Sequence, residues 1–550
     1  MLNLYFLKYQ TMKNFILLFL LLTSSSIFSQ QTFTRKDSLQ GGLRPERTNF
    51  DVTLYNLNIK IDIEKKHIVG YNEIHFKVLA NKMNKIQIDL FENMQVDSIV
   101  FENKKLAYKR DNNAVFIDFP YYMLSKSDHK IKFYYSGNPQ IAKNAPWDGG
   151  FVFKKDTNNK DFVAVACQGT GASLWFPCKD SQSDEPNNGA NISIEAPNGL
   201  IAVSNGRLLG STPKENGFTR WDWQVKNPIN SYNITLNIAD YVHFSDTNKG
   251  LDLDYYVLRN DLEKAKIQFT QVKPMLDCFE TKFGEYPFKN DGFKLVQTPY
   301  LGMEHQSCVA YGNKFQNGYL GRDISGSGIG LLFDYIIIHE SGHEWFGNSI
   351  TSIDIADMWI HEGFTTYAES VFVECQYGAQ KAQEYLKGMS KNIGNNKPII
   401  GNYGVNKQGS GDMYNKGAVM INTLRYVIND DAKWWQIMYQ FTKDFRHQIT
   451  NTESVITFFN TVSGMNLTPI FNQYLRFTNV PILQLKIVNK KLEFKWIADD
   501  NNFNLPIEIK LNNKIVKLQP TTKTQIADFK VAKMEEISVL TDKIYIKIEK

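Results

Sequence analysis

The sequence predicts a multidomain α+β protein with an all-β N-terminal domain, a mixed domain of helices and strands, and a small C-terminal β domain. Apolar and polar residues alternate from Leu57 to Ile63 and again from Leu483 to Ile487, which is the period of half-buried strands. Residues 261–285 read as helical, and the chain after Glu362 reads as mixed helices to about residue 476. With 550 residues, 43% of them hydrophobic, the chain can build several sizeable cores.

Residues 1–30 read as a secretory signal peptide. Lys13 precedes the apolar run 15–22, and small polar residues follow that run, which is the order of a leader. The apolar run is too short to span a bilayer, and Met12 is an alternative start. A buried N-terminal helix is the alternative interpretation. We therefore expect an exported protein, periplasmic or secreted, with no integral membrane segment in the mature chain.

Residues 31–245 are expected to form the all-β domain. Its first part, 31–49, is polar, and we expect it to be loosely held. Alternating patterns such as Ile74 to Val78 then predict antiparallel strands. The stretch 166–180 is too rich in glycine for a plain strand, and by itself it reads as a β-bulge with a packed tryptophan, Trp175.

The mixed domain is expected at residues 246–478 and the C-terminal β domain at 479–550. A helix is predicted over 261–285, with a kink or break at Pro274. From Val480 onward the pattern returns to a period of two, which predicts strands.

Composition limits the classes of partner. The formal net charge is +5, and two of these positive charges, Lys8 and Lys13, lie in the expected leader. So weak a charge on so long a chain argues against nucleic acid as a partner. The cysteines show no close-pair zinc pattern, and their odd number, 5, leaves at least one unpaired. We expect them to be mostly buried small apolar residues, with no bridge between Cys167 and Cys178.

The sequence concentrates its chemistry in His339-Glu340-Ser341-Gly342-His343, which follows the apolar run 336–338. Residues four apart lie on one face of a helix, so His339 and His343 can share one zinc ion. Glu340 is rotated off that face and flanks the metal, where a general base belongs. Two ordinary histidines on a helix are the alternative interpretation of this pentapeptide alone.

A third metal ligand is available farther along the chain. Glu362 follows His343 after eighteen intervening residues, in a stretch, 358–369, that reads as a second helix. A catalytic zinc takes three protein ligands and keeps one open position. Two histidines from one helix and Glu362 from the next supply three ligands.

This pattern resembles the zinc signature of the M1 aminopeptidases, the gluzincin group that includes leukotriene A4 hydrolase and aminopeptidase N. The resemblance rests on His-Glu-x-x-His-x-Trp-Phe-Gly-Asn at 339–348 and Trp-Ile-x-Glu-Gly-Phe at 359–364. It extends over about residues 50–480 and implies a thermolysin-like mixed α/β catalytic domain at 246–478. Many members continue into a large C-terminal helical domain, which we do not expect here.

The resemblance also implies residues that bind the substrate. Met303 and Glu304 match the family's Gly-x-Met-Glu-Asn motif, which lies on an edge strand beside the active site, whereas Leu301 stands where the first Gly is usual. Gly302, at the variable position, is a further substrate-binding candidate. Glu304 would hold the free ammonium group of a peptide, a strong charge-assisted contact. His305 replaces the usual Asn, and a role for it as a fourth zinc ligand is an alternative. Gln168 would reach the substrate's amino terminus from the β domain.

Tyr414 matches the family's tyrosine, which is followed by x-Lys-Gly and donates its phenol to the developing oxyanion. A core tyrosine is the alternative interpretation, and Tyr403 is a weaker rival for the role. With Glu340 as the base, the resemblance therefore implies two catalytic residues.

The sequence thus predicts an exported zinc aminopeptidase that holds one Zn²⁺ per chain and acts on peptides with a free N-terminus. One alternative is a zinc endopeptidase or another gluzincin hydrolase, such as one that opens epoxides. A second alternative is an exported peptide-binding protein that has lost catalysis.

Overall fold

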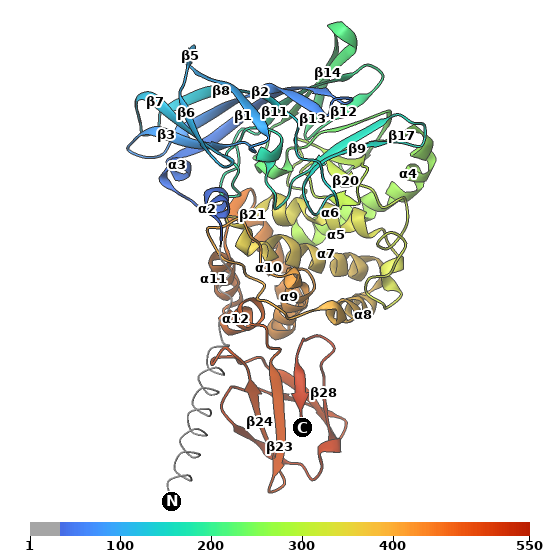
Figure 1. Ribbon diagram of the computed structural model, residues 1–550. Coiled ribbons are helices and arrows are strands. Elements are labelled where there is room, and N and C mark those ends of the chain that lie inside the picture. Colours follow the sequence, from blue (N-terminus) through green and yellow to red (C-terminus); the bar gives the residue numbers. More distant parts are fainter. Residues whose placement is uncertain (1–32) are drawn as a thin grey trace, which may run out of the picture.

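The computed structural model describes residues 33–550, so the expected signal peptide lies outside the described residues. A β-rich N-terminal part, a mostly helical middle part and a C-terminal pair of sheets follow one another from top to bottom of Figure 1. This order confirms the predicted α+β class and architecture. Across residues 33–550, every helix is too short or too polar to cross a membrane. The exact domain boundaries stay predictions.

An eight-stranded sheet forms the upper layer of the N-terminal part. In spatial order its strands are β13 (Arg207–Lys214), β14 (Phe218–Val225), β11 (Ala190–Pro197), β1 (Phe50–Asp62), β2 (His67–Val78), β8 (Asp128–Gly137), β4 (Met94–Phe101) and β5 (Lys104–Lys105). β1 pairs antiparallel with β2, as predicted, but parallel with β11. Leu57, Ile59 and Ile61 are all buried, which confirms the alternation seen in the sequence.

Two smaller sheets complete the N-terminal part. The three-stranded sheet contains β3 (Lys82–Asp89), β7 (Ala114–Leu124) and β6 (Tyr108–Asp111). The four-stranded sheet contains β12 (Ile201–Val203), β15 (Asn237–Ala239), β10 (Asp161–Ala166) and β9 (Gly150–Lys155). After β10, Trp175 packs against Phe151 of β9 in the core of the N-terminal part and has no exposed surface.

The expectation that residues 31–49 are loosely held was wrong. The described part of this stretch forms α2 (Arg35–Gly41) and α3 (Pro45–Thr48). Arg47 is completely buried, and its guanidinium lies 2.5 Å from the Asp89 carboxylate. A buried charge needs such a partner, and a polar composition alone does not reveal one that lies far along the chain.

The middle part combines a five-stranded sheet with helices. The sheet contains β16 (Tyr241–Asn248), β17 (Leu251–Leu258), β18 (Phe293–Gln297), β20 (Val309–Tyr311) and β19 (Gly302–Met303), so β19 is an edge strand. The helices are α4 (Leu262–Gln268), α5 (Val272–Phe283), α6 (Tyr335–Gly342), α7 (Trp359–Tyr377), α8 (Ala379–Met389), α9 (Asn415–Ile428), α10 (Asp431–Asp444), α11 (Thr452–Ser463) and α12 (Thr468–Arg476). Two short strands, β21 (Ile350–Ser352) and β22 (Gln448–Thr450), pair in parallel. The helix predicted over 261–285 is divided into α4 and α5 by a short turn at Phe269–Gln271. The division therefore lies before Pro274, which is in the first turn of α5, where its missing N–H costs little.

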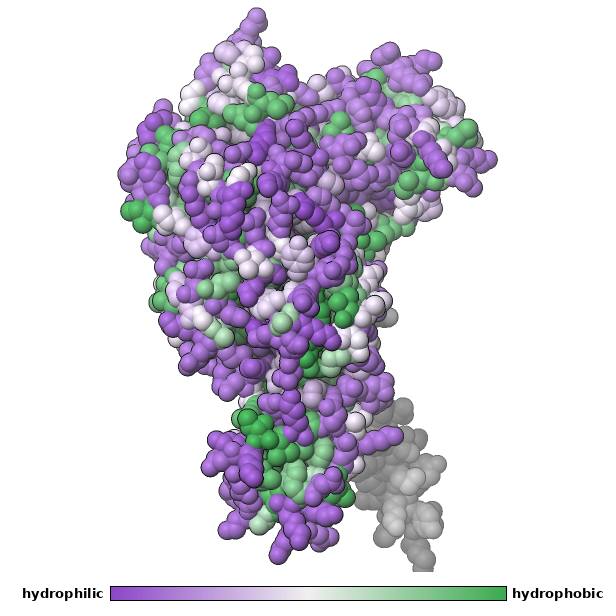
Figure 2. All heavy atoms as spheres, turned by 180° about the vertical axis from the view of Figure 1, so that it is seen from behind, coloured by the Kyte–Doolittle hydropathy of each residue, from purple (hydrophilic) through white to green (hydrophobic). Residues whose placement is uncertain are grey.

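The C-terminal part consists of two small sheets. One contains β27 (Gln525–Lys530), β24 (Lys491–Ile497), β23 (Ile482–Val488) and β29 (Lys547–Glu549), and the other contains β26 (Lys514–Leu518), β25 (Ile507–Leu511) and β28 (Ile537–Val539). Leu483, Leu485 and Trp496 are buried between them and the helices, as the alternation predicted. Figure 2 shows hydrophobic residues gathered on this part, below a mostly hydrophilic surface.

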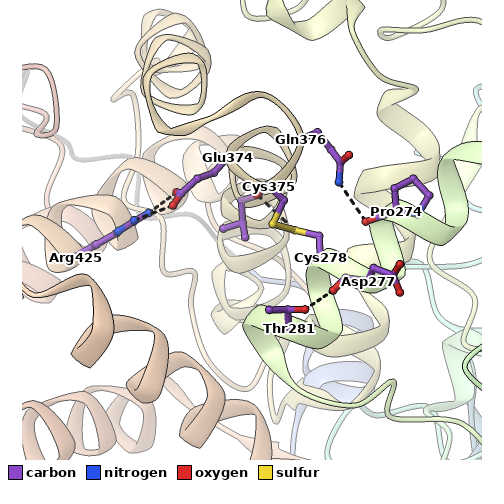
Figure 3. The surroundings of a disulfide bond; sticks show 9 residues. Pro274, Asp277, Cys278, Thr281, Glu374, Cys375, Gln376 and Arg425 are labelled. Carbon is purple, nitrogen blue, oxygen red and sulfur yellow. Dashed lines mark hydrogen bonds and ion pairs between the residues drawn. A yellow bond between two sulfur atoms is a disulfide. The ribbon is translucent and has the colours of Figure 1, made fainter.

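The structure corrects the expectation for two of the cysteines. Cys278 of α5 and Cys375 of α7 form a disulfide that joins the two helices (Figure 3). The other three, Cys167, Cys178 and Cys308, are free and buried, as expected. The bridged pair is separated by 97 positions in the sequence, and no spacing rule identifies partners at that range.

Candidate active site

Helix α6 brings the first two predicted metal ligands together. Asp334 caps its N-terminus by accepting hydrogen bonds from the backbone N–H groups of Ile336 and Ile337. The helix ends at Gly342, one residue before His343, but His343 keeps helical dihedral angles and its N–H donates to the carbonyl of His339. The Nε2 atoms of the two imidazoles therefore lie 3.3 Å apart.

A tight bend after α6 fixes the orientation of His343. Gly347 has a φ of +124°, a region that favours glycine. A Cβ atom on Gly347 would come within 3.1 Å of His343 Nδ1. The bend turns the carbonyl of Phe346 toward His343, whose Nδ1–H donates to it at 2.8 Å.

Helix α7 supplies the third ligand. Glu362 Oε2 lies 3.5 Å from His339 Nε2 and 3.2 Å from His343 Nε2, and all three side chains are buried. The corners of a tetrahedron around zinc, with bonds of 2.0–2.1 Å, are also about 3.3 Å apart. Within residues 33–550, this buried Glu362 oxygen has no hydrogen-bond partner. The donor set and its spacing fit a zinc ion.

The other ring nitrogen of each imidazole, Nδ1, makes a hydrogen bond to a protein group outside the predicted metal position. His339 Nδ1 donates to Glu369 Oε1 at 2.6 Å, and Tyr385 donates to the other oxygen of Glu369. Such contacts fix the tautomer that leaves Nε2 free to bind a metal. Sequence reasoning missed Glu369, although it follows Glu362 by seven residues and so lies two turns along the same face of α7.

Glu340 lines the cleft beside these ligands, where a general base was predicted. Burial raises its pKa, while the imidazoles of His339 and His343 act in the opposite direction. Gly302 leaves the space for the Glu340 carboxylate, because a Cβ atom on Gly302 would approach Glu340 Oε1 to 2.7 Å. A side chain at position 302 would displace the base.

Glu304 follows edge strand β19, as the resemblance implied, and it is 2% exposed. Its Oε1 accepts hydrogen bonds from Gln168 Nε2 and, at 3.2 Å, from the hydroxyl of Tyr232. Ligand-type atoms of Glu304, Glu340 and His343 all lie within 4.8 Å of one another. Burial, which outweighs the field of the His343 imidazole, raises the pKa of Glu304 to about 7.

Tyr414 directly precedes α9 and lines the same cleft as the predicted metal ligands. Its ring stacks on His339 with centroids 6.1 Å apart. Burial, followed by the nearby carboxylates of Glu362 and Glu304, keeps the pKa of Tyr414 well above its usual value. The phenol therefore stays protonated at neutral pH and remains a hydrogen-bond donor.

Tyr403 and His305, the two rival candidates from the sequence, do not take part in the metal-binding cluster. Tyr403 donates its hydroxyl to Asp357 at 2.7 Å and is half exposed. His305 is fully buried, and burial lowers its pKa to about 3. Among the described residues, neither of its ring nitrogens has a partner, and it is not part of a group spaced to hold a metal.

One cleft of about 430 Å³ joins all the predicted site residues. Its lining includes Gln168, Gly302, Met303, Glu304, His339, Glu340, His343, Glu362 and Tyr414. Asp37 of α2 and the exposed Trp147 also line it. The sequence did not predict either, because nothing in their local pattern places them near the cleft.

Comparisons with known proteins agree with this geometry. The family model described as "Peptidase M1 N-terminal domain" matches residues 52–233, and that described as "Peptidase family M1 domain" matches residues 267–474. The chain is 24% identical to endoplasmic reticulum aminopeptidase 1 of Mus musculus over 53% of this chain and 32% of that protein. It is 25% identical to aminopeptidase B of Mus musculus over 54% of this chain and 46% of that protein. The chain thus spans between a third and a half of the length of these relatives.

The fold is similar to that of solved structures. The M1 zinc metallopeptidase from Deinococcus radiodurans superposes with a TM-score of 0.67 at 17% identity, covering 80% of this chain and 95% of that one. Together the two family models account for most of the chain, and of the lining residues named above only Asp37 lies outside them. The chain belongs to the M1 family of peptidases.

Proposed function

We propose that the protein is a zinc-dependent aminopeptidase that hydrolyses the first peptide bond of peptides with a free N-terminus. The position of Glu304 carries this proposal. The Glu304 carboxylate is buried, and its ligand-type oxygen lies within 4.8 Å of those of Glu340 and His343. It would bind an ammonium group strongly, because the contact is charge-assisted and shielded from water.

His339, His343 and Glu362 would hold the metal. Zinc bound there supplies Lewis acidity, which acidifies water and polarises a carbonyl group. Glu340 accepts a proton from the attacking water and passes it to the leaving amine as the peptide bond breaks. The base is then regenerated, and one water is consumed for each bond cleaved.

The remaining side chains orient the substrate and stabilise charge. Glu304 and Gln168 bind the N-terminal ammonium and so place a single peptide bond near Glu340. The protonated phenol of Tyr414 donates to the oxygen that becomes negative as water adds to the carbonyl. All three of these residues line the cleft together with the predicted metal ligands.

A peptide and its N-acetylated form provide the test. Acetylation removes the positive charge that Glu304 is proposed to bind. We expect hydrolysis of the acetylated peptide to be at least about 100-fold slower, which corresponds to ~3 kcal/mol. Equal rates would instead support the zinc endopeptidase alternative. No hydrolysis of either peptide by zinc-loaded protein would support the inactive peptide-binding alternative.

We further propose that the protein is exported. The leader-like residues 1–30 support this, and so does the disulfide between Cys278 and Cys375, because disulfides persist in oxidising compartments. Cell fractionation and N-terminal sequencing test the proposal. We expect a mature N-terminus close to residue 31, and full-length protein in the cytoplasm would refute export.

A further inference from the structure

The short segment 304–307, which carries Glu304, is buried along its whole length. It is fixed mainly through its backbone. Asn348 donates to the carbonyl of Glu304 at 2.8 Å, and Asn205 donates to the carbonyl of Gln306 at 2.7 Å. These donors come from two different parts of the chain, since Asn205 belongs to the N-terminal part and Asn348 follows α6.

The last residue of this segment has an unusual backbone conformation. Ser307 has a φ of +53°, in the left-handed region that is uncommon for residues other than glycine. Such a conformation persists only where its surroundings hold it. Lys294 donates to the carbonyl of Ser307 at 2.9 Å, and the Ser307 hydroxyl accepts a hydrogen bond from the N–H of Gly206.

The N–H of Ser307 is held by the residue that directly follows a metal ligand. It donates to Glu344 Oε1 at 2.9 Å, and Glu344 is next to His343 in the sequence. The other oxygen of Glu344 accepts a hydrogen bond from the hydroxyl of Tyr286 at 3.1 Å. Glu344 has no exposed surface, so its carboxyl group acts on the protein and not on the substrate.

We propose that Glu344 is a positioning residue that sets the distance between Glu304 and the metal-binding side of His343. The inference rests on the proposed aminopeptidase function. In a peptide, the N-terminal nitrogen and the first carbonyl carbon are only about 2.5 Å apart. A shift of Glu304 by even 1 Å therefore moves the scissile carbonyl away from the base.

Substitutions of Glu344 test this role. Glu344→Ala removes both acceptors, and Glu344→Asp keeps a carboxyl group but withdraws it by one methylene. We expect both to reduce the preference for a free over an acetylated peptide at least tenfold, with the zinc content unchanged. Glu344→Gln should keep most of the preference, because its amide oxygen can still accept from Ser307 and its NH₂ group can donate to Tyr286.

A matched control separates positioning from general damage. Tyr286→Phe removes the other partner of the Glu344 carboxyl but leaves the contact to Ser307, so the preference should be kept. Rates are measured with enzyme in excess, so that slow cleavage of the acetylated peptide is seen, and melting temperatures are recorded in parallel.

Two results would overturn the inference, and they are distinguishable. If wild-type protein discriminates but the Asp variant, or a folded Ala variant, keeps the full preference, Glu344 does not position Glu304. If wild-type protein itself fails to discriminate, the proposed function is wrong, and this inference is lost with it.

Discussion

Gly417 of α9 lies directly against Gly363 of α7, so that a Cβ atom on Gly417 would come within 2.9 Å of the Gly363 Cα atom. Gly363 follows the metal ligand Glu362, and Gly417 follows Tyr414 by three residues. The close crossing of the two helices is therefore what brings the phenol of Tyr414 beside the metal-binding cluster. Because glycine has no Cβ atom, the backbones of the two helices can approach each other closely at this point.

Gly417→Ala should lower turnover without removing the metal ligands. The added methyl group must push α9 away from α7, which costs about 1–3 kcal/mol of stability and displaces Tyr414. We expect kcat to fall between about 10- and 100-fold, since misplacement by 1 Å can have that effect. Gly411→Ala is the matched control, because nothing lies within 4 Å of its added Cβ atom. Equal activity in both variants would contradict the argument.

Glu340→Gln should abolish most turnover while keeping zinc. An amide cannot accept the proton of the attacking water, and general-base catalysis is typically worth 10²–10⁴-fold. Metal analysis and kcat on a free peptide check this expectation. Full activity in the variant would eliminate Glu340 as the base.

Glu369→Gln should weaken zinc binding and leave the base intact. Loss of the carboxylate that orients His339 typically costs 10–100-fold in metal affinity. Titration with a chelator should inactivate the variant at lower concentrations, and added zinc should restore activity. Tyr385→Phe, which removes only the partner of the second Glu369 oxygen, should have a smaller effect. An unchanged chelator profile would mean that Glu369 does not support the metal.

The parts that could be predicted from the sequence are those carried by local pattern or fixed spacing. The strand alternation and the positions of His339, His343 and Glu362 belong to this class. The side chains that complete the site are joined by tertiary contacts instead. Tyr232 reaches Glu304 from 72 positions away, and no local pattern distinguishes it from other tyrosines. The buried Arg47 was missed for the same reason.

Replacing Cys278 and Cys375 with serine should lower stability. The bridge closes a loop of 97 positions. A loop of that size corresponds to about 5 kcal/mol in the chain-entropy account, and removing a native disulfide typically costs about 2–5 kcal/mol. Because Cys375 is exposed, a reductant should lower the melting temperature of wild-type protein. The same reductant should leave the melting temperature of the double serine variant unchanged. A matching decrease in that variant would show that the bridge is not the cause.

Glu185→Gln should flatten the dependence of stability on pH. Glu185 belongs to the N-terminal part, and Thr351 of β21 donates to it at 2.6 Å. Burial raises the pKa of Glu185 from 4.5 to about 7. Between these two pH values the native protein keeps a proton that the unfolded chain has lost, so stability falls as the pH rises through this window.

Above pH 7 the full cost is present, roughly 3 kcal/mol at most, and glutamine at position 185 avoids it because it does not ionise. Urea unfolding midpoints of wild-type protein and the variant, compared at pH 5 and pH 8, isolate this group, because the other titrating groups are common to both proteins. We expect the variant to gain stability relative to wild type at pH 8 compared with pH 5. Parallel pH profiles would show that Glu185 keeps its ordinary pKa in the folded protein.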